Sequence, residues 1–169
     1  MGTRRGAGSL VRVGVLLGMS ALFWGACAGP ESTASGEGGW LRGTPDEKFD
    51  VVARQLRGFD MAMIETDYRY QHLYWAGEDQ NWGAATYQVT KIETTIRNAL
   101  ERRPKRAPTA EAFLKNDLPP IKDAITGRNQ ALFRQRFTAL TTACNACHVA
   151  EQVPFFVVRA PTVRIAPGP

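Results

Sequence analysis

The chain has 169 residues, which is enough for one domain with a hydrophobic core but not for two of ordinary size. Its formal net charge is +5, but three of the 21 basic residues are arginines within the first twelve positions. Without them, 18 basic residues stand against 16 acidic ones and leave +2. So weak a charge gives no support to nucleic-acid binding.

The amino end has the layout of an export signal. Arg4, Arg5 and Arg12 precede the apolar run VGVLLGMSALFW, which is followed by the small residues of GACAG. This order is typical of a secretory signal, and the run is too short to span a membrane. We therefore expect residues 1–28 to be a secretory or lipoprotein signal region and the mature protein to be periplasmic.

Two ways of processing this signal stay open. Cleavage after ACA fits the small-x-small pattern, whereas GAC resembles a lipoprotein signal in which Cys27 becomes the lipid-bearing residue. We favour lipidation of Cys27, because the glycine- and serine-rich residues 29–44 would then be a flexible linker between a membrane anchor and the folded part.

From Pro45 onward, apolar residues recur at steps of three and four, the spacing of amphipathic helices. The first predicted helix runs from Asp46 to a stop at Gly77. Its expected inward seam consists of Phe49, Val52, Leu56, Phe59, Met63, Tyr70 and Leu73, with Thr66 filling the gap. The second helix is expected over residues 81–103, with a stripe of Trp82, Ala85, Val89, Ile92, Ile96 and Ala99.

A third helix is expected over residues 109–126, kinked or split by Pro119 and Pro120. Its inward face is Leu114, Leu118, Ile121 and Ile125, and it ends at Gly127. Asn129 caps the fourth helix, whose stripe is Phe133, Phe137, Leu140, Cys144 and Cys147. The pattern predicts an all-α fold, an antiparallel up-down-up-down four-helix bundle over residues 45–150, followed by an extended, proline-rich tail over residues 151–169.

The stretch CNACH, residues 144–148, carries the chemistry. On a helix, Cys144, Cys147 and His148 face the same side, since residues at i, i+3 and i+4 are neighbours. C-x-x-C-H is the attachment signature of c-type haem, in which both thiols form thioethers and the histidine binds iron. The motif therefore predicts one covalent haem c.

Three other uses of the motif fit less well. Zinc needs two further ligands, and the chain offers only His72 and Cys27 besides carboxylates. A redox dithiol normally lies at a helix start beside a sheet, and no sheet is predicted. A helical C-x-x-C disulfide is strained and leaves His148 unexplained.

With four predicted helices and C-x-x-C-H near the end of the last, the chain from about Pro45 to His148 resembles cytochrome c′ and its low-spin relatives. The resemblance implies a haem-binding bundle with His148 as the proximal iron ligand and thioether links at Cys144 and Cys147. Relatives often form homodimers. The low-spin members place a methionine from the first helix on iron, whereas cytochrome c′ leaves that position open to nitric oxide or carbon monoxide.

The distal ligand decides between these uses, and Met63 is the best candidate for it. Met63 lies on the predicted seam, whereas Met61 is about 200° around the helix. Measured along one continuous helix from Asp46, Met63 is about 25 Å away and His72 nearly 40 Å, so His72 is too distant for a haem near the helix start. Leu56 and Phe59 are the expected haem neighbours on this side.

The sequence thus favours an exported monohaem cytochrome that transfers single electrons to and from a redox partner protein. A five-coordinate protein that binds nitric oxide or carbon monoxide, and a haem-bearing structural subunit of a respiratory complex, are the alternatives. Enzyme activity is not expected, because the pattern places no inward carboxylate pair near iron. The basic run ERRPKR, residues 101–106, is interpreted as a solvated loop.

Overall fold

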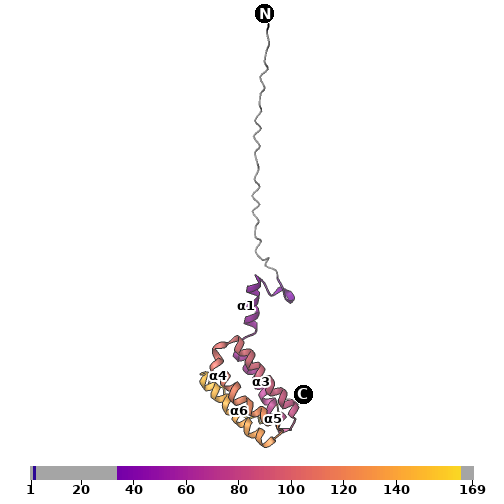
Figure 1. Ribbon diagram of the computed structural model, residues 1–169, viewed down its shortest axis with the longest axis vertical. Coiled ribbons are helices and arrows are strands. Elements are labelled where there is room, and N and C mark those ends of the chain that lie inside the picture. Colours follow the sequence, from indigo (N-terminus) through magenta and orange to yellow (C-terminus); the bar gives the residue numbers. More distant parts are fainter. Residues whose placement is uncertain (1, 3–33, 165–169) are drawn as a thin grey trace. The chain divides into compact units, whose positions relative to one another are not determined.

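The computed structural model describes residue 2 and residues 34–164 (Figure 1). Within these residues the chain is helical, apart from an isolated bridge between Ser35 and Leu41, which confirms the all-α class. No helix in this part of the chain combines the length and apolarity needed to cross a bilayer. The predicted signal sequence and Cys27 lie outside the described residues.

The residues just before the first α-helix form a short local structure. A 3₁₀ turn, η1 (Glu37–Gly39), lies inside the Ser35–Leu41 bridge. Helix α1 (Pro45–Gln55) then begins with a capping box, as the Thr44 N–H donates to the Glu47 carboxylate at 2.7 Å and the Glu47 N–H donates to the Thr44 hydroxyl at 3.3 Å. The predicted helix start at this point is therefore correct.

The predicted first helix is two helices. Helix α1 ends at Gln55, Arg57 adopts a left-handed φ of 56°, and helix α2 (Phe59–Glu78) begins after Gly58. The expectation that the whole seam faces inward is wrong at its beginning, where Phe49, Val52 and Leu56 are 72%, 36% and 56% exposed. These side chains precede α2, so they do not share its inward face. Farther on, Tyr70 and Leu73 are buried as expected.

Gly77 does not stop α2, contrary to expectation. The helix continues to Glu78, and the chain turns at Gln80, which has a left-handed φ of 55°. Gly77 instead lets α2 approach a neighbouring helix closely, because a Cβ built on it would lie 2.0 Å from a ring carbon of Phe133.

Helices α3 (Trp82–Arg102) and α6 (Gln130–Ala150) agree with the sequence pattern. Asn81 caps α3 by accepting the Ala84 N–H at 3.1 Å, and Asn129 caps α6 by accepting the Leu132 N–H at 3.0 Å. The predicted stripe of α3 is buried except for Trp82, which is half-buried.

The proline-rich third segment is split, as predicted. It consists of a 3₁₀ turn η2 (Pro104–Arg106), helix α4 (Ala107–Ala112), a π-helical turn η3 (Phe113–Asp117) and helix α5 (Leu118–Thr126), capped at Gly127. In η3 the Leu118 N–H donates to the Phe113 carbonyl, five residues back. Pro119 and Pro120 lack the N–H groups that an α-helix would use at the next two positions, which accounts for the irregular turn.

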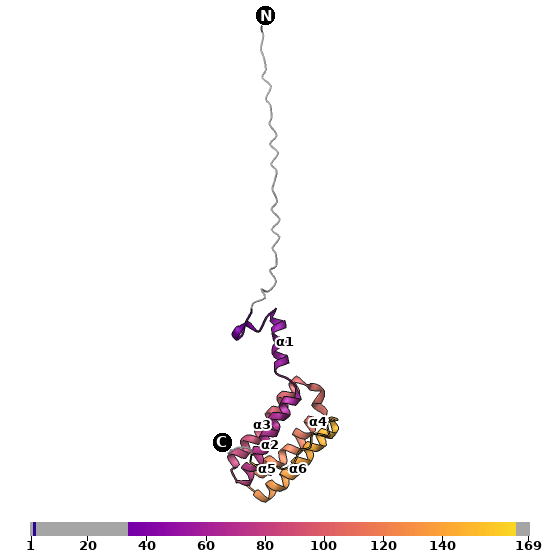
Figure 2. The same ribbon diagram turned by 180° about the vertical axis from the view of Figure 1, so that it is seen from behind.

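Helices α2, α3, α5 and α6 lie side by side in both views (Figures 1 and 2), with α2 along α3 and α5 along α6. Short turns at residues 79–81 and 127–129 reverse the chain between each pair. Their shared core consists of Tyr70, Leu73, Ala76, Ala85, Val89, Ile92, Ile96, Leu114, Leu118, Ile121, Ile125, Phe133, Phe137 and Leu140. Cys144 packs at the edge of this core, so the CNACH motif lies where the core ends.

Candidate haem-attachment site

The CNACH motif lies in the last two turns of α6. The helix continues without a break to Ala150, so the side chains of Cys144, Cys147 and His148 project from one face, and all three are half-buried. Both cysteines are free thiols. Across the described residues, no three His, Cys, Asp or Glu side chains are grouped to hold a metal ion by themselves.

The thiols are surrounded by protein. Burial raises the pKa of the Cys144 thiol to about 12, with smaller contributions from Cys147 and Asp117. Burial also raises the pKa of Cys147, although a hydrogen bond from Thr109 and the charge of Arg106 act in the opposite direction. Reactive redox dithiols have lowered pKa values instead. The environment therefore differs from that of a thioredoxin-type dithiol.

The imidazole of His148 has one nitrogen engaged by the backbone. Its Nδ1 lies 2.6 Å from the carbonyl oxygen of Phe156, and because a carbonyl can only accept, Nδ1 carries the proton. The lone pair is then on Nε2. Histidines that bind metals almost always donate their other ring N–H to a carbonyl or carboxylate in this way, which fixes the tautomer and the ring orientation.

The Phe156 carbonyl belongs to a segment that turns back along α6, and we call residues 153–164 the tail strap. Gln152 has a left-handed φ of 62°, which reverses the chain, and the Val153 N–H then donates to the His148 carbonyl at 2.9 Å. Farther along, the Val158 backbone forms two hydrogen bonds with the Asn145 amide side chain, of 2.8 and 3.0 Å. The tail strap is thus attached at Asn145, between the two cysteines, and at His148, directly after the second one.

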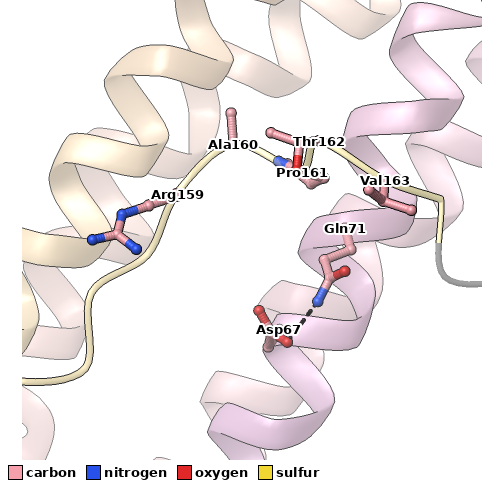
Figure 3. Close-up of a pocket in the computed structure, with 7 residues that line it drawn as sticks. All are labelled: Asp67, Gln71, Arg159, Ala160, Pro161, Thr162 and Val163. Atoms are coloured by element: carbon pink, nitrogen blue, oxygen red, sulfur yellow. Dashed lines mark hydrogen bonds between the residues drawn. The ribbon is translucent and has the colours of Figure 1, made fainter.

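The far end of the tail strap reaches α2. The guanidinium of Arg164 binds the Asp79 carboxylate at 2.6 Å and lies 4.5 Å from the centre of the Trp75 ring. Between these attachments the strap and α2 line an open, shallow pocket of about 330 Å³ (Figure 3). Its lining residues are Asp67, Gln71, Arg159, Ala160, Pro161, Thr162 and Val163.

A polar cluster ties the preceding loop to the end of α6. Arg106 and Thr109 both bind the carboxylate of Glu151, the residue that follows α6. The interpretation of residues 101–106 as a merely solvated loop is therefore wrong for Arg106. No local pattern predicts this contact, because its partners are more than 40 positions apart.

Two contacts fix the register of α2 against α6. The Tyr70 and Thr141 hydroxyls are 2.6 Å apart, and eight residues later on α2 the Glu78 carboxylate binds Arg134, which lies seven residues earlier on α6. The two helices are therefore antiparallel. Seven residues before Tyr70 is Met63, and seven residues after Thr141 is His148.

This register brings Met63 and His148 to the same level. Seven residues are nearly two turns, so each helix presents almost the same face, with a drift of about 20°. Met63 is half-buried and packs at the core edge, as does Phe59 one turn earlier. His72 lies nine residues beyond Met63, about 14 Å along the axis, and its ring packs on Tyr68 at 4.3 Å.

The other predicted site residues divide as follows. Leu56 is exposed and lies before α2 begins, so it is not on the face that carries Met63, and its predicted place beside the haem has no support from packing. Met61 is 40% exposed, in agreement with the expectation that it points away. No role was predicted for Asn145, the second residue of CNACH, although an Asn side chain can pair with both the N–H and the C=O of a backbone residue.

No family model matches the chain, and the searches of curated proteins and of solved structures return no match.

Proposed function

We infer that the protein is an exported monohaem c-type cytochrome that transfers single electrons. The observation that carries this proposal is the state of His148, whose Nδ1–H is engaged by the Phe156 carbonyl while Nε2 is left as a lone-pair donor beside two free cysteines. The residues present fit the cofactor that C-x-x-C-H attaches elsewhere. Under this proposal α2, α3, the α4–α5 segment and α6 are the four members of an up-down-up-down bundle of the cytochrome c′ type, and residues 151–169 are its extended tail.

Three side chains would hold haem. Cys144 and Cys147 would each add S–H across one vinyl group, with a new carbon–sulfur bond and the hydrogen on the other vinyl carbon, so that no atom is lost. The Nε2 atom of His148, oriented by the tail strap, would be the proximal ligand. When bound, the haem iron supplies the one-electron Fe(III)/Fe(II) couple, and redox partner proteins give and take the electron.

On the distal side, Met63 is the proposed sixth ligand and Phe59 its neighbour, and Leu56 is left out of the pocket because it is exposed and precedes α2. The register of α2 against α6 supports Met63, since the Tyr70–Thr141 contact brings it level with His148. If no protein group occupied the sixth position, the same pocket would bind carbon monoxide or nitric oxide. Periplasmic location, lipidation at Cys27 and a homodimer belong to the same proposal.

The test is the absorption spectrum of protein produced with haem maturation, oxidised and reduced, with and without carbon monoxide. We expect covalently attached haem, a low-spin spectrum and no response to carbon monoxide. Met63→Ala should abolish the methionine–iron charge-transfer band, whereas the matched control Met61→Ala, at an exposed position two residues away, should leave it unchanged.

Three results would contradict parts of the proposal. A high-spin spectrum that shifts with carbon monoxide would replace the electron carrier by a gas-binding protein. Loss of the charge-transfer band in Met61→Ala but not in Met63→Ala would reverse the assigned register. Absence of covalent haem from the matured protein, or its retention in Cys144→Ser/Cys147→Ser, would refute the cytochrome itself.

A further inference from the structure

Thr66 has a buried hydroxyl without a partner. Its Oγ1 is shielded from solvent and makes no hydrogen bond within the described part of the chain. Other helical threonines satisfy theirs by donating to the carbonyl one turn back; they are Thr86, Thr90, Thr94, Thr138, Thr141 and Thr142. An unpaired buried hydroxyl lowers stability. Its presence in the middle of α2 therefore indicates an acceptor that comes within hydrogen-bond distance only when the site is filled.

The hydroxyl lies on the face of α2 that looks toward the haem-attachment site. Thr66 is three residues after Met63 and four residues before Tyr70, so it shares their face. Tyr70 on that face contacts Thr141 of α6. By the same register, Thr66 lies opposite Cys144 and Asn145. The Asn145 amide bonds to the Val158 backbone and the Thr141 carbonyl, and the Thr66 hydroxyl makes no hydrogen bond to it.

We propose that the Thr66 hydroxyl is the distal hydrogen-bond donor of the haem pocket, and that its acceptor is the atom in the sixth coordination position of the iron. The inference rests on the proposed function and goes beyond it, since it assigns a residue that tunes the iron without ligating it. With Met63 as ligand, the acceptor is the thioether sulfur three residues away on the same face. In a five-coordinate pocket, the acceptor is the outer atom of a bound diatomic gas.

Thr66 is thus a positioning residue, and its effect on the iron has a sign. A hydrogen bond to the methionine sulfur withdraws electron density from it, which makes the sulfur a weaker donor to Fe(III) and favours Fe(II). Removing the hydroxyl should therefore lower the reduction potential. The same loss should raise the stretching frequency of bound carbon monoxide in the gas-binding case, because the donor no longer stabilises charge on the oxygen.

The experiment compares Thr66→Val, which keeps the shape, with Thr66→Ser, which keeps the hydroxyl, in haem-loaded and haem-free protein. In the loaded protein we expect Thr66→Val to favour oxidation by at least about threefold in the equilibrium constant, which is about 30 mV for one electron, and Thr66→Ser to stay near wild type. In the haem-free protein Thr66→Val should melt at the same or a higher temperature, because the unpaired hydroxyl is gone.

The outcomes distinguish failure of the role proposed for Thr66 from failure of the proposed function on which it rests. Haem that attaches normally, with equal potentials and equal carbon monoxide frequencies in Thr66→Val, Thr66→Ser and wild type, would overturn the role of Thr66 and leave the cytochrome intact. A wild type without covalent haem would overturn both. If Thr66→Val does not accumulate in loaded form, Thr66→Ala provides the same comparison with Thr66→Ser.

Discussion

Replacing Gly77 with alanine tests the close approach of α2 to α6 at Phe133. A Cβ at this position would lie 2.0 and 2.1 Å from the Cε1 and Cζ atoms of Phe133. Carbon atoms in contact are separated by about 3.5–4.0 Å, so the overlap is about 1.5 Å. The Phe133 ring is fully buried and packs against the rings of Trp82 and Phe137, so it has no free space to enter.

Two effects of opposite sign determine how Gly77→Ala changes the free energy of unfolding. Gly77 lies inside α2, where alanine is favoured over glycine by about 1 kcal/mol. Inserting a methyl group into a packed core costs about 1–3 kcal/mol, or more when backbone has to move. Since α2 or α6 must shift to remove an overlap of this size, we expect the steric cost to win. Gly77→Ala should lower the free energy of unfolding by about 1–3 kcal/mol, a fall of several degrees in melting temperature.

The assay is urea and thermal unfolding followed by circular dichroism, with Gly83→Ala as the matched control. Gly83 is also in a helix, but it is exposed and a Cβ there would meet only the Asn81 side chain at 3.8 Å. This control should be neutral or stabilising by up to about 1 kcal/mol. Phe133→Leu should partly rescue Gly77→Ala in a double-mutant cycle. If Gly77→Ala were as stable as Gly83→Ala, the reasoning about the α2–α6 contact would be refuted.

The remaining predictions concern the tail strap. Asn145→Ala should weaken its attachment by about 1–2 kcal/mol, which would show as proteolysis within residues 153–164 that is faster by about tenfold, and an unchanged rate would contradict the pairing with Val158. The Arg164 guanidinium lowers the pKa of Asp79, so the attachment should be complete above pH ~4 and lost as Asp79 protonates at lower pH. Backbone order parameters of residues 159–164 should fall over that range in wild type, and should be low at every pH in Asp79→Asn. Truncation after Glu151 should lower the haem potential, because water reaches the haem edge, and an unaltered potential and spectrum would mean that the strap does not shield it.

Sequence reasoning succeeded where a helix has one buried face along its full length. The stripes of α3 and α5 could be predicted because every member except the half-buried Trp82 is buried by neighbouring helices, and the caps at Asn81 and Asn129 are local signals. The prediction for the start of the first seam was wrong. Phe49 and Val52 have helical spacing but are exposed, because periodicity alone does not show whether another surface packs against the stripe.

The prediction from the prolines was correct and the prediction from Gly77 was wrong, because the effect of proline is local and the role of Gly77 depends on a distant residue. Pro119 and Pro120 predicted a break, since the loss of two N–H donors is a local effect. Gly77 was expected to end α2, yet its role depends on Phe133, 56 residues away. In the site, the CNACH motif could be identified from five letters. The carbonyl that orients His148 could not, because it comes from a tail whose course no local pattern describes.

The distance from Asp46 to Met63 along one continuous helix does not apply, because α1 and α2 are separate helices. The register of α2 against α6 supports Met63 as distal ligand independently of that distance. The Tyr70–Thr141 contact and the heptad step bring Met63, and not His72, level with His148. That register also depends on the close approach at Gly77 and the Glu78–Arg134 ion pair, two turns beyond Tyr70. Gly77→Ala should therefore weaken the methionine–iron band as well as the fold, even though Gly77 is about 20 Å from Met63 along α2.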